Sequence, residues 1–174
     1  MRTELRLTIG TAEISKDTLY RYRLTREWDA DRPVVNFIGL NPSTADALVD
    51  DPTIRRCIGF AKRWGFGKLI MTNLFALRCT DPAKLCFAAV DPIGPQTNGW
   101  LETSAAEASL VVAAWGAVDG LMRDDVRFAQ RRAVVVCNLI FTTSIHALGF
   151  TKAGFPRHPL YMRGDAKPLP WVTR

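Results

Sequence analysis

The stretch from Val34 to Thr44, VVNFIGLNPST, decides the fold. Its first part, Val34 to Leu40, is an almost wholly apolar run of strand length, which is typical of a strand buried on both faces of a parallel sheet. The polar residues 41–44 follow at once, and Pro42 among them cannot continue the strand ladder. Because ligands of such sheets bind beyond the carboxyl ends of the strands, this junction predicts an α/β protein with a binding site here.

Strands and helices alternate along the rest of the chain. Asp51 and Pro52 form a helix start signal, because aspartate caps free N–H groups and proline suits the first helical position. Apolar and polar residues alternate from Tyr20 to Thr25, as expected for a half-buried strand in which Arg21 and Arg23 lie on the polar side. The other expected strands are Lys68–Asn73, Leu110–Trp115 and Ile145–Phe150, and the expected helices are Pro52–Trp64, a short one from Pro82, Asn98–Ala108 and Arg123 to about Ala133.

This alternation predicts the architecture. Parallel strands need crossover connections, and these place helices on the faces of the sheet. We therefore expect a single three-layer α/β domain over residues 1–174, with a mainly parallel four-stranded central sheet and helices on both faces. Residues 1–30 would add an N-terminal β extension, and residues 163–174 a C-terminal tail. Periodicity leaves open whether the last helix continues through Val134–Ile140 or gives way to a strand.

The composition limits the class of protein. Of the 174 residues, 48% are hydrophobic and 23% are charged, which is ordinary for a globular domain. The longest apolar run, Ala133 to Phe141, is broken by Asn138 and is too short to span a membrane. The first residues lack the apolar core of a secretion signal. We expect a cytoplasmic protein with no membrane partner, and the sequence leaves its oligomeric state open.

Charge and cysteine content give weaker indications. The net charge is +6, and the excess lies in residues 123–174, a region that can attract phosphate groups or form only a solvated helix face and tail. No two cysteines have the C-x-x-C spacing of a metal or redox site, so neither a metal nor a cofactor is expected. The cysteines are Cys57, Cys79, Cys86 and Cys137, and the basic residues of the last third are Arg123, Arg127, Arg131, Arg132, Lys152, Arg157, Arg163, Lys167 and Arg174.

Two further segments carry polar groups suited to a site. Asn73 ends the strand Lys68–Asn73, and its amide offers both a donor and an acceptor to a nucleobase edge, or ties down a loop; Arg78 follows as a candidate phosphate contact. The late loop Gly154–Tyr161 holds His158 between prolines, which stiffen it. Asp46 and Asp50 are weaker candidates for a general base, whereas Asp51 is explained as the helix cap.

Five sequence blocks together resemble one family. The blocks are FIGLNPSTAD, DDPTIRRCIGFAKRWGFG, TNLFALRCTDP, VVAAWG and GFPRHPLY, and they span about Tyr20 to Met162. In this order they are similar to the domain-of-unknown-function family 1643, whose name supplies no activity.

The order of the blocks is also similar, more distantly, to the uracil-DNA glycosylase superfamily. The resemblance implies a fold of that type, with Asn41 in the water-positioning place and Asn73 in the base-reading place. It implies that His158 stabilises negative charge on the leaving base. Ser43 departs from the family's glycine and Leu160 from its late-loop serine, although Leu160 or Tyr161 can serve as an apolar wedge. The cysteines lack the spacing of the iron–sulfur glycosylases.

The resemblance implies a hydrolase that recognises a nucleobase or nucleotide and cleaves an N-glycosidic bond, with DNA or a nucleotide as partner. Two alternatives stay open: a non-catalytic module that binds nucleic acid or a nucleotide, and a hydrolase of a free nucleoside or other N-glycoside. The candidate catalytic residues are Asn41 and His158, and the candidate substrate-binding residues are Gly39, Leu40, Pro42, Ser43, Thr44, Asn73, Arg78, Trp115, Gly116, Arg157, Pro159 and Tyr161.

Overall fold

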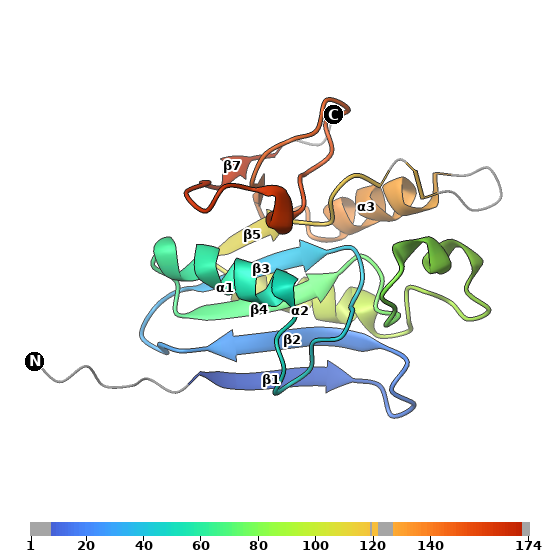
Figure 1. The fold of residues 1–174 in the computed structure, drawn as a ribbon, viewed down its shortest axis with the longest axis horizontal. Helices are drawn as coiled ribbons and strands as arrows, with labels where there is room; N and C mark the ends of the chain where they lie inside the picture. The colour runs from blue at the N-terminus through green and yellow to red at the C-terminus, as the bar shows by residue number, and fades with distance from the viewer. Residues whose placement is uncertain (1–7, 119, 122–126, 172–174) are drawn as a thin grey trace, which may run out of the picture.

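A computed structural model describes residues 8–118, 120–121 and 127–171. Within these residues the strands form one mixed seven-stranded sheet in the order β1-β2-β4-β3-β5-β6-β7 (Figure 1). The strands are β1 Ile9–Ile14, β2 Arg21–Glu27, β3 Val34–Gly39, β4 Lys68–Asn73, β5 Leu110–Ala113, β6 Ile145–Ala147 and β7 Leu169–Pro170.

The sheet is larger than the sequence predicts. Strands β4, β3, β5 and β6 are parallel neighbours, while β1, β2 and β7 pair antiparallel at its two edges. The prediction of a four-stranded sheet is therefore wrong in its strand count, because the N-terminal extension and part of the C-terminal tail pair with the central strands. In the β3–β4 ladder Gly39 pairs with Asn73, so both strands end at the same level.

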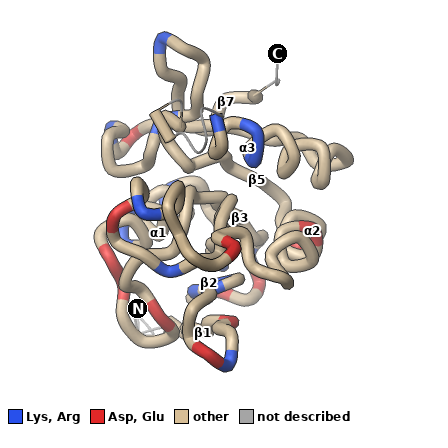
Figure 2. The backbone as a smooth tube through the Cα atoms, turned by 90° about the vertical axis from the view of Figure 1, so that its right-hand side faces the viewer, with Lys and Arg blue, Asp and Glu red and all other residues tan. Residues whose placement is uncertain are grey.

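Helices cover both faces of the sheet, which gives three layers. Helix α1 packs on one face with Val35, Phe37 and Met71, while α2 and α3 pack on the other with Ile38 and Val111. Figure 2 shows the strands between α1 and α2. The helices are α1 Pro52–Arg63, the 3-10 helix η1 Pro82–Phe87, α2 Thr97–Glu107, α3 Phe128–Leu139 and the 3-10 helix η2 Pro159–Tyr161.

The start of α1 follows its predicted signal. The Asp51 side chain accepts a hydrogen bond from the Ile54 N–H at 2.9 Å, and Pro52 occupies the first turn. The inward-facing residues Ile54, Cys57, Phe60 and Ala61 recur at helical spacing.

Three other boundaries differ from the prediction. Strands β5 and β6 end at Ala113 and Ala147, before the expected Trp115 and Phe150. The expected helix start at Arg123 lies outside the described residues. Within them α3 runs through Leu139, so the segment VVVCNLI belongs mainly to the helix rather than to a strand.

Strand β2 departs from the expected alternation through a β-bulge. Glu13 of β1 pairs with Arg23, but the next residue, Ile14, pairs with Arg21, so Tyr22 is an extra residue in β2. In a regular strand residues 21 and 23 share a face. Here Arg23 reaches Glu107 of α2, whereas Arg21 donates to the Ala45 carbonyl on the opposite, α1 face. The bulge therefore turns Arg21 into the interior, where it is only 2% exposed.

No helix in the described part of the chain combines the length and apolar character needed to cross a membrane.

Candidate functional site

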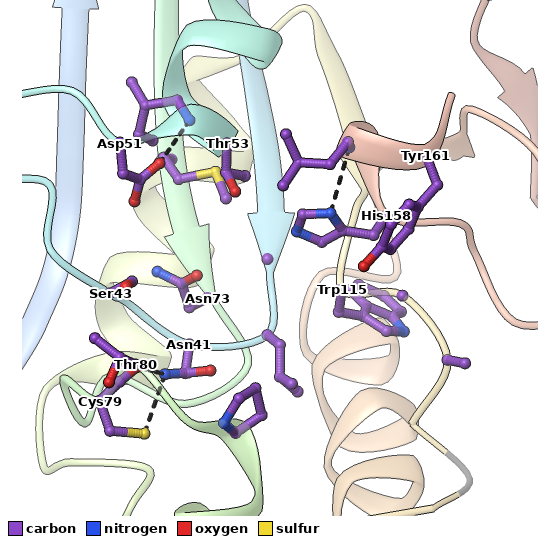
Figure 3. A pocket seen from close by; sticks show the side chains of 18 of the residues that line it. Asn41, Ser43, Asp51, Thr53, Asn73, Cys79, Thr80, Trp115, His158 and Tyr161 are labelled. Atoms are coloured by element: carbon purple, nitrogen blue, oxygen red, sulfur yellow. Dashed lines mark hydrogen bonds between the residues drawn. The ribbon is translucent and has the colours of Figure 1, made fainter. Parts of the chain in front are cut away.

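A cavity of about 740 Å³ lies at the carboxyl edge of the parallel strands (Figure 3). Its walls come from the ends of β3 and β4, the start of α1, the loop after β5 and the late loop around η2. This volume is typical of a small-molecule site. The structure brings ten of the predicted residues to this cavity: Gly39, Leu40, Asn41, Ser43, Asn73, Trp115, Gly116, Arg157, His158 and Tyr161.

Four predicted residues do not line this cavity. Thr44 and Arg78 line a shallower hollow next to it, which also includes Ser43 and Lys84. Pro159 is buried at the start of η2, and Pro42 contributes only its carbonyl, which accepts from Asn41. Arg78 is thus placed for a group outside the main cavity rather than within it.

Asn73 is the most constrained polar group of the cavity. It ends β4 and is only 2% exposed. Neither its Nδ2 nor its Oδ1 has a hydrogen-bond partner among the described residues. An unsatisfied buried amide costs about 1–3 kcal/mol, so this side chain is suited to a ligand that supplies both an acceptor and a donor.

Asn41 has a fixed orientation. Its Nδ2 donates to the carbonyl oxygens of Cys79 at 2.7 Å and Pro42 at 3.0 Å. Because both partners are acceptors, the amide nitrogen must be the atom that faces them. Oδ1 is left on the side of Asn41 that faces away from Cys79 (Figure 3). It is available there to accept a hydrogen bond from a water molecule or a ligand.

His158 is held as a neutral donor. Its Nδ1 accepts a hydrogen bond from the Leu160 N–H at 3.3 Å. Burial lowers the pKa of His158, although the Asp51 carboxylate opposes this shift. In the neutral ring the proton is then on Nε2, on the side that faces Thr53 and Asn73 (Figure 3). The cavity therefore contains an N–H donor that needs no added proton.

The loop after β5 closes the cavity beside His158. Trp115 is 2% exposed, and its ring meets that of Trp171 edge-on at 5.3 Å. Gly116 has a φ of +80°, which favours glycine, and a Cβ there would lie 3.4 Å from the His158 Cβ. Tyr161 is 80% exposed, and its ring centroid lies 5.9 Å from that of His158.

The carboxylate that reaches the cavity is not one of the two expected base candidates. Asp46 accepts from the N–H groups of Leu48 and Val49, and Asp50 pairs with Arg26 at 2.8 Å. Asp51 lines the cavity while it caps α1. Its position directly before a helix that starts at the ligand-binding edge is a signal that the sequence contains.

Arg21 also lines the cavity, and the sequence predicted it on the polar side of a half-buried strand. The β-bulge that turns it inward depends on the pairing of β2 with β1. No local pattern around Arg21 identifies it.

The basic residues of the last third do not act as one group. Arg132 is only 5% exposed and donates to the Leu74 carbonyl and to Asn98. Arg163 pairs with Asp165. Arg123 and Arg174 lie outside the described residues. A phosphate-binding face made of this whole segment is therefore wrong for Arg132.

Among the residues that the structure describes, no group of three or more His, Cys, Asp or Glu side chains is arranged to hold a metal ion. The four cysteines are free thiols.

The fold and cavity define an α/β protein with a polar small-molecule site at the carboxyl edge of its parallel strands. The chain belongs to the family described as Protein of unknown function (DUF1643), whose model matches residues 21–160. The matched range begins at Arg21 and includes Asn41, Asn73 and His158. No curated protein and no solved structure matches the chain.

Proposed function

We propose that this protein is a hydrolase that recognises a nucleobase and cleaves the N-glycosidic bond between that base and its sugar. The observation that carries the proposal is the buried amide of Asn73, with both polar atoms free in the cavity. An amide with a free donor and a free acceptor matches the polar edge of a nucleobase. The distant similarity of the motif order to the uracil-DNA glycosylase superfamily supports the same reaction.

The cavity supplies a group for each part of the reaction. The oxygen of a water molecule adds to the sugar C1′, and the C1′–N bond breaks with its electron pair passing to the base. His158 Nε2–H donates to the negative charge that develops on the base, and Asn41 Oδ1 orients the water. The Asp51 carboxylate accepts the proton that the water releases. The proton finally reaches the base, and the sugar keeps the hydroxyl group.

The test is base release. Purified protein is incubated with DNA duplexes and single strands that contain uracil, hypoxanthine or other altered bases, and with free nucleosides and nucleotides. Alkaline cleavage reports abasic sites in DNA, and chromatography reports free bases. We expect release from at least one substrate class, and a loss of about 100-fold or more in Asn41→Ala and His158→Ala.

Matched controls separate the site from general effects. Asn138→Ala changes an exposed asparagine of α3, and His146→Ala changes the other histidine of the chain, on β6. Both controls should keep full activity. Full activity in Asn41→Ala and His158→Ala would contradict the assigned roles. Binding of a nucleotide or nucleic acid without base release on any substrate would favour the non-catalytic binding module.

A further inference from the structure

We propose that the ligand of this cavity is a nucleoside monophosphate and that Arg21 binds its phosphate inside the cavity. This inference rests on the proposed function, because it takes Asn73 as the group that binds the base. It adds the chemical class of the substrate: a free nucleotide whose phosphate enters the cavity together with the base.

Arg21 is a buried guanidinium with spare hydrogen-bonding capacity. Its Nη1 donates to the Ala45 carbonyl at 2.6 Å, and its Nε is buried without an acceptor among the described residues. A guanidinium carries five N–H donors in a planar fork, which suits two oxygens of one phosphate. One backbone carbonyl leaves most of that fork unused.

Arg21 also lacks a counter-ion in the described structure. No carboxylate of the described residues lies within salt-bridge distance of it, unlike the equally buried Arg26, which pairs with Asp50. The nearest acidic groups, Asp51 and Asp46, accept hydrogen bonds from backbone N–H groups. Burial lowers the pKa of Arg21 to about 10, the direction expected for a cation taken out of water without compensation. An anionic ligand group would supply that compensation.

The strand pairing places this cation beside the base-binding amide. The backbone N–H of Arg21 donates to the Ala76 carbonyl at 2.9 Å, so the start of β2 lies along the segment that follows Asn73. Both side chains line the same cavity. A single ligand can therefore contact Asn73 through its base and Arg21 through its phosphate.

The burial of Arg21 favours a mononucleotide over a nucleic-acid strand. At 2% exposure it is accessible only to a group that enters the cavity. When a base is extruded from a strand, the backbone phosphates stay on the outside of the protein, where Arg78 and Lys84 line the neighbouring hollow. A free nucleotide brings its phosphate in, and about 740 Å³ is sufficient for a molecule of that size.

The experiment measures the contribution of the phosphate to binding. Isothermal titration calorimetry compares the 5′-monophosphates of adenosine, guanosine, cytidine, uridine and inosine, and their deoxy forms, with the matched nucleosides, with sodium phosphate and with short single-stranded DNA. We expect at least one monophosphate to bind about 10- to 100-fold more tightly than its nucleoside, as charge-assisted hydrogen bonds predict. In Arg21→Met this advantage should disappear while the nucleoside affinity stays the same.

A neighbouring arginine gives the matched control. Arg23→Met removes one positive charge from the same strand, but on the face that carries Glu107 and Trp100. It should keep the preference for the monophosphate. If Arg21→Met does not fold, Arg21→Lys retains the charge without the planar fork, and we expect it to weaken nucleotide binding while nucleoside binding stays unchanged.

The outcomes separate this inference from the proposed function. Equal affinity for nucleoside and monophosphate, a preference that survives in Arg21→Met, or binding of DNA but of no monophosphate would each overturn the inference. Base release from DNA with no mononucleotide binding would overturn it and leave the hydrolase proposal standing. Tight, Arg21-dependent nucleotide binding without base release would support it and refute the hydrolysis.

Discussion

Gly39 and Asn73 are paired in register at the ends of β3 and β4, and the absence of a side chain at Gly39 makes room for the Asn73 amide. A Cβ at position 39 would lie 2.7 Å from Asn73 Oδ1 and 2.6 Å from Met71 Cε. Ordinary Cβ contacts are longer, so any other residue at position 39 must displace the side chain of Asn73. The glycine of the first block thus sets the position of the amide proposed to bind the base.

Gly39→Ala should therefore damage the site more than the fold. We expect it to weaken ligand binding by at least tenfold and to lower the free energy of unfolding by about 1–3 kcal/mol, as overpacking of a buried position does. Denaturant unfolding and the calorimetric titration described above measure the two effects. Gly99→Ala is the control, because Gly99 is exposed in α2 and has no atom within 4 Å of the added Cβ. It should stabilise the protein by about 0.5–1 kcal/mol. Unchanged binding in Gly39→Ala would contradict the steric argument.

Asn73→Leu should separate stability from binding. It replaces a buried amide that has no partner in the described structure by an apolar group of similar size, so the free energy of unfolding should stay the same or rise by about 1 kcal/mol. Ligand binding should be lost. Asn36→Leu is the comparison: Asn36 Oδ1 accepts from the Thr72 hydroxyl, which would be left unpaired. That variant should lose about 1–3 kcal/mol. Equal destabilisation of both variants in chemical denaturation would count against a free amide at Asn73.

His158 should make stability depend on pH. Burial lowers its pKa in the folded protein, while the unfolded chain keeps a value near 6.5. Between these two values the unfolded chain binds more protons, so stability falls as the pH drops below about 6.5. His158→Gln removes this contribution. The loss of stability between pH 7.5 and 5.5, measured by urea unfolding, should be smaller in the variant than in the wild-type protein. Identical losses would show that His158 is not buried in its neutral form.

Asp51 has two roles that different substitutions separate. Asp51→Ala removes the acceptor for the Ile54 N–H and should cost about 1 kcal/mol of stability. Asp51→Asn keeps an oxygen that caps α1, so its stability should match the wild-type protein. It lacks the carboxylate proposed to accept the proton, and base release should fall. Full activity in Asp51→Asn, measured with the substrate that wild-type protein hydrolyses, would limit Asp51 to its capping role.

The central elements could be predicted because their signals are local. Val34 to Leu40 and Lys68 to Asn73 are apolar runs that match β3 and β4 almost residue for residue. Asp51 and Pro52 place the start of α1. Since parallel strands end at one edge, the same runs also bring Asn41, Asn73 and Gly116 to one cavity.

The remaining elements depend on contacts between distant parts of the chain. Leu169–Pro170 is a strand only because it pairs with β6, and no short-range pattern marks those two residues. The seven-stranded sheet was therefore missed at its edges. Arg23 and Arg21 look equivalent in the sequence, yet they lie on opposite faces of the sheet.

The sequence by itself determined the parallel α/β core, the capped first helix and the polar residues at the carboxyl edge, because hydrophobic periodicity and capping act over a few neighbouring residues. The tertiary structure decided that Arg21 enters the cavity, that Asp51 reaches it and that Arg78 does not. These placements follow from strand register, a β-bulge and loop packing, which bring together residues distant in the chain, and no local sequence pattern encodes them.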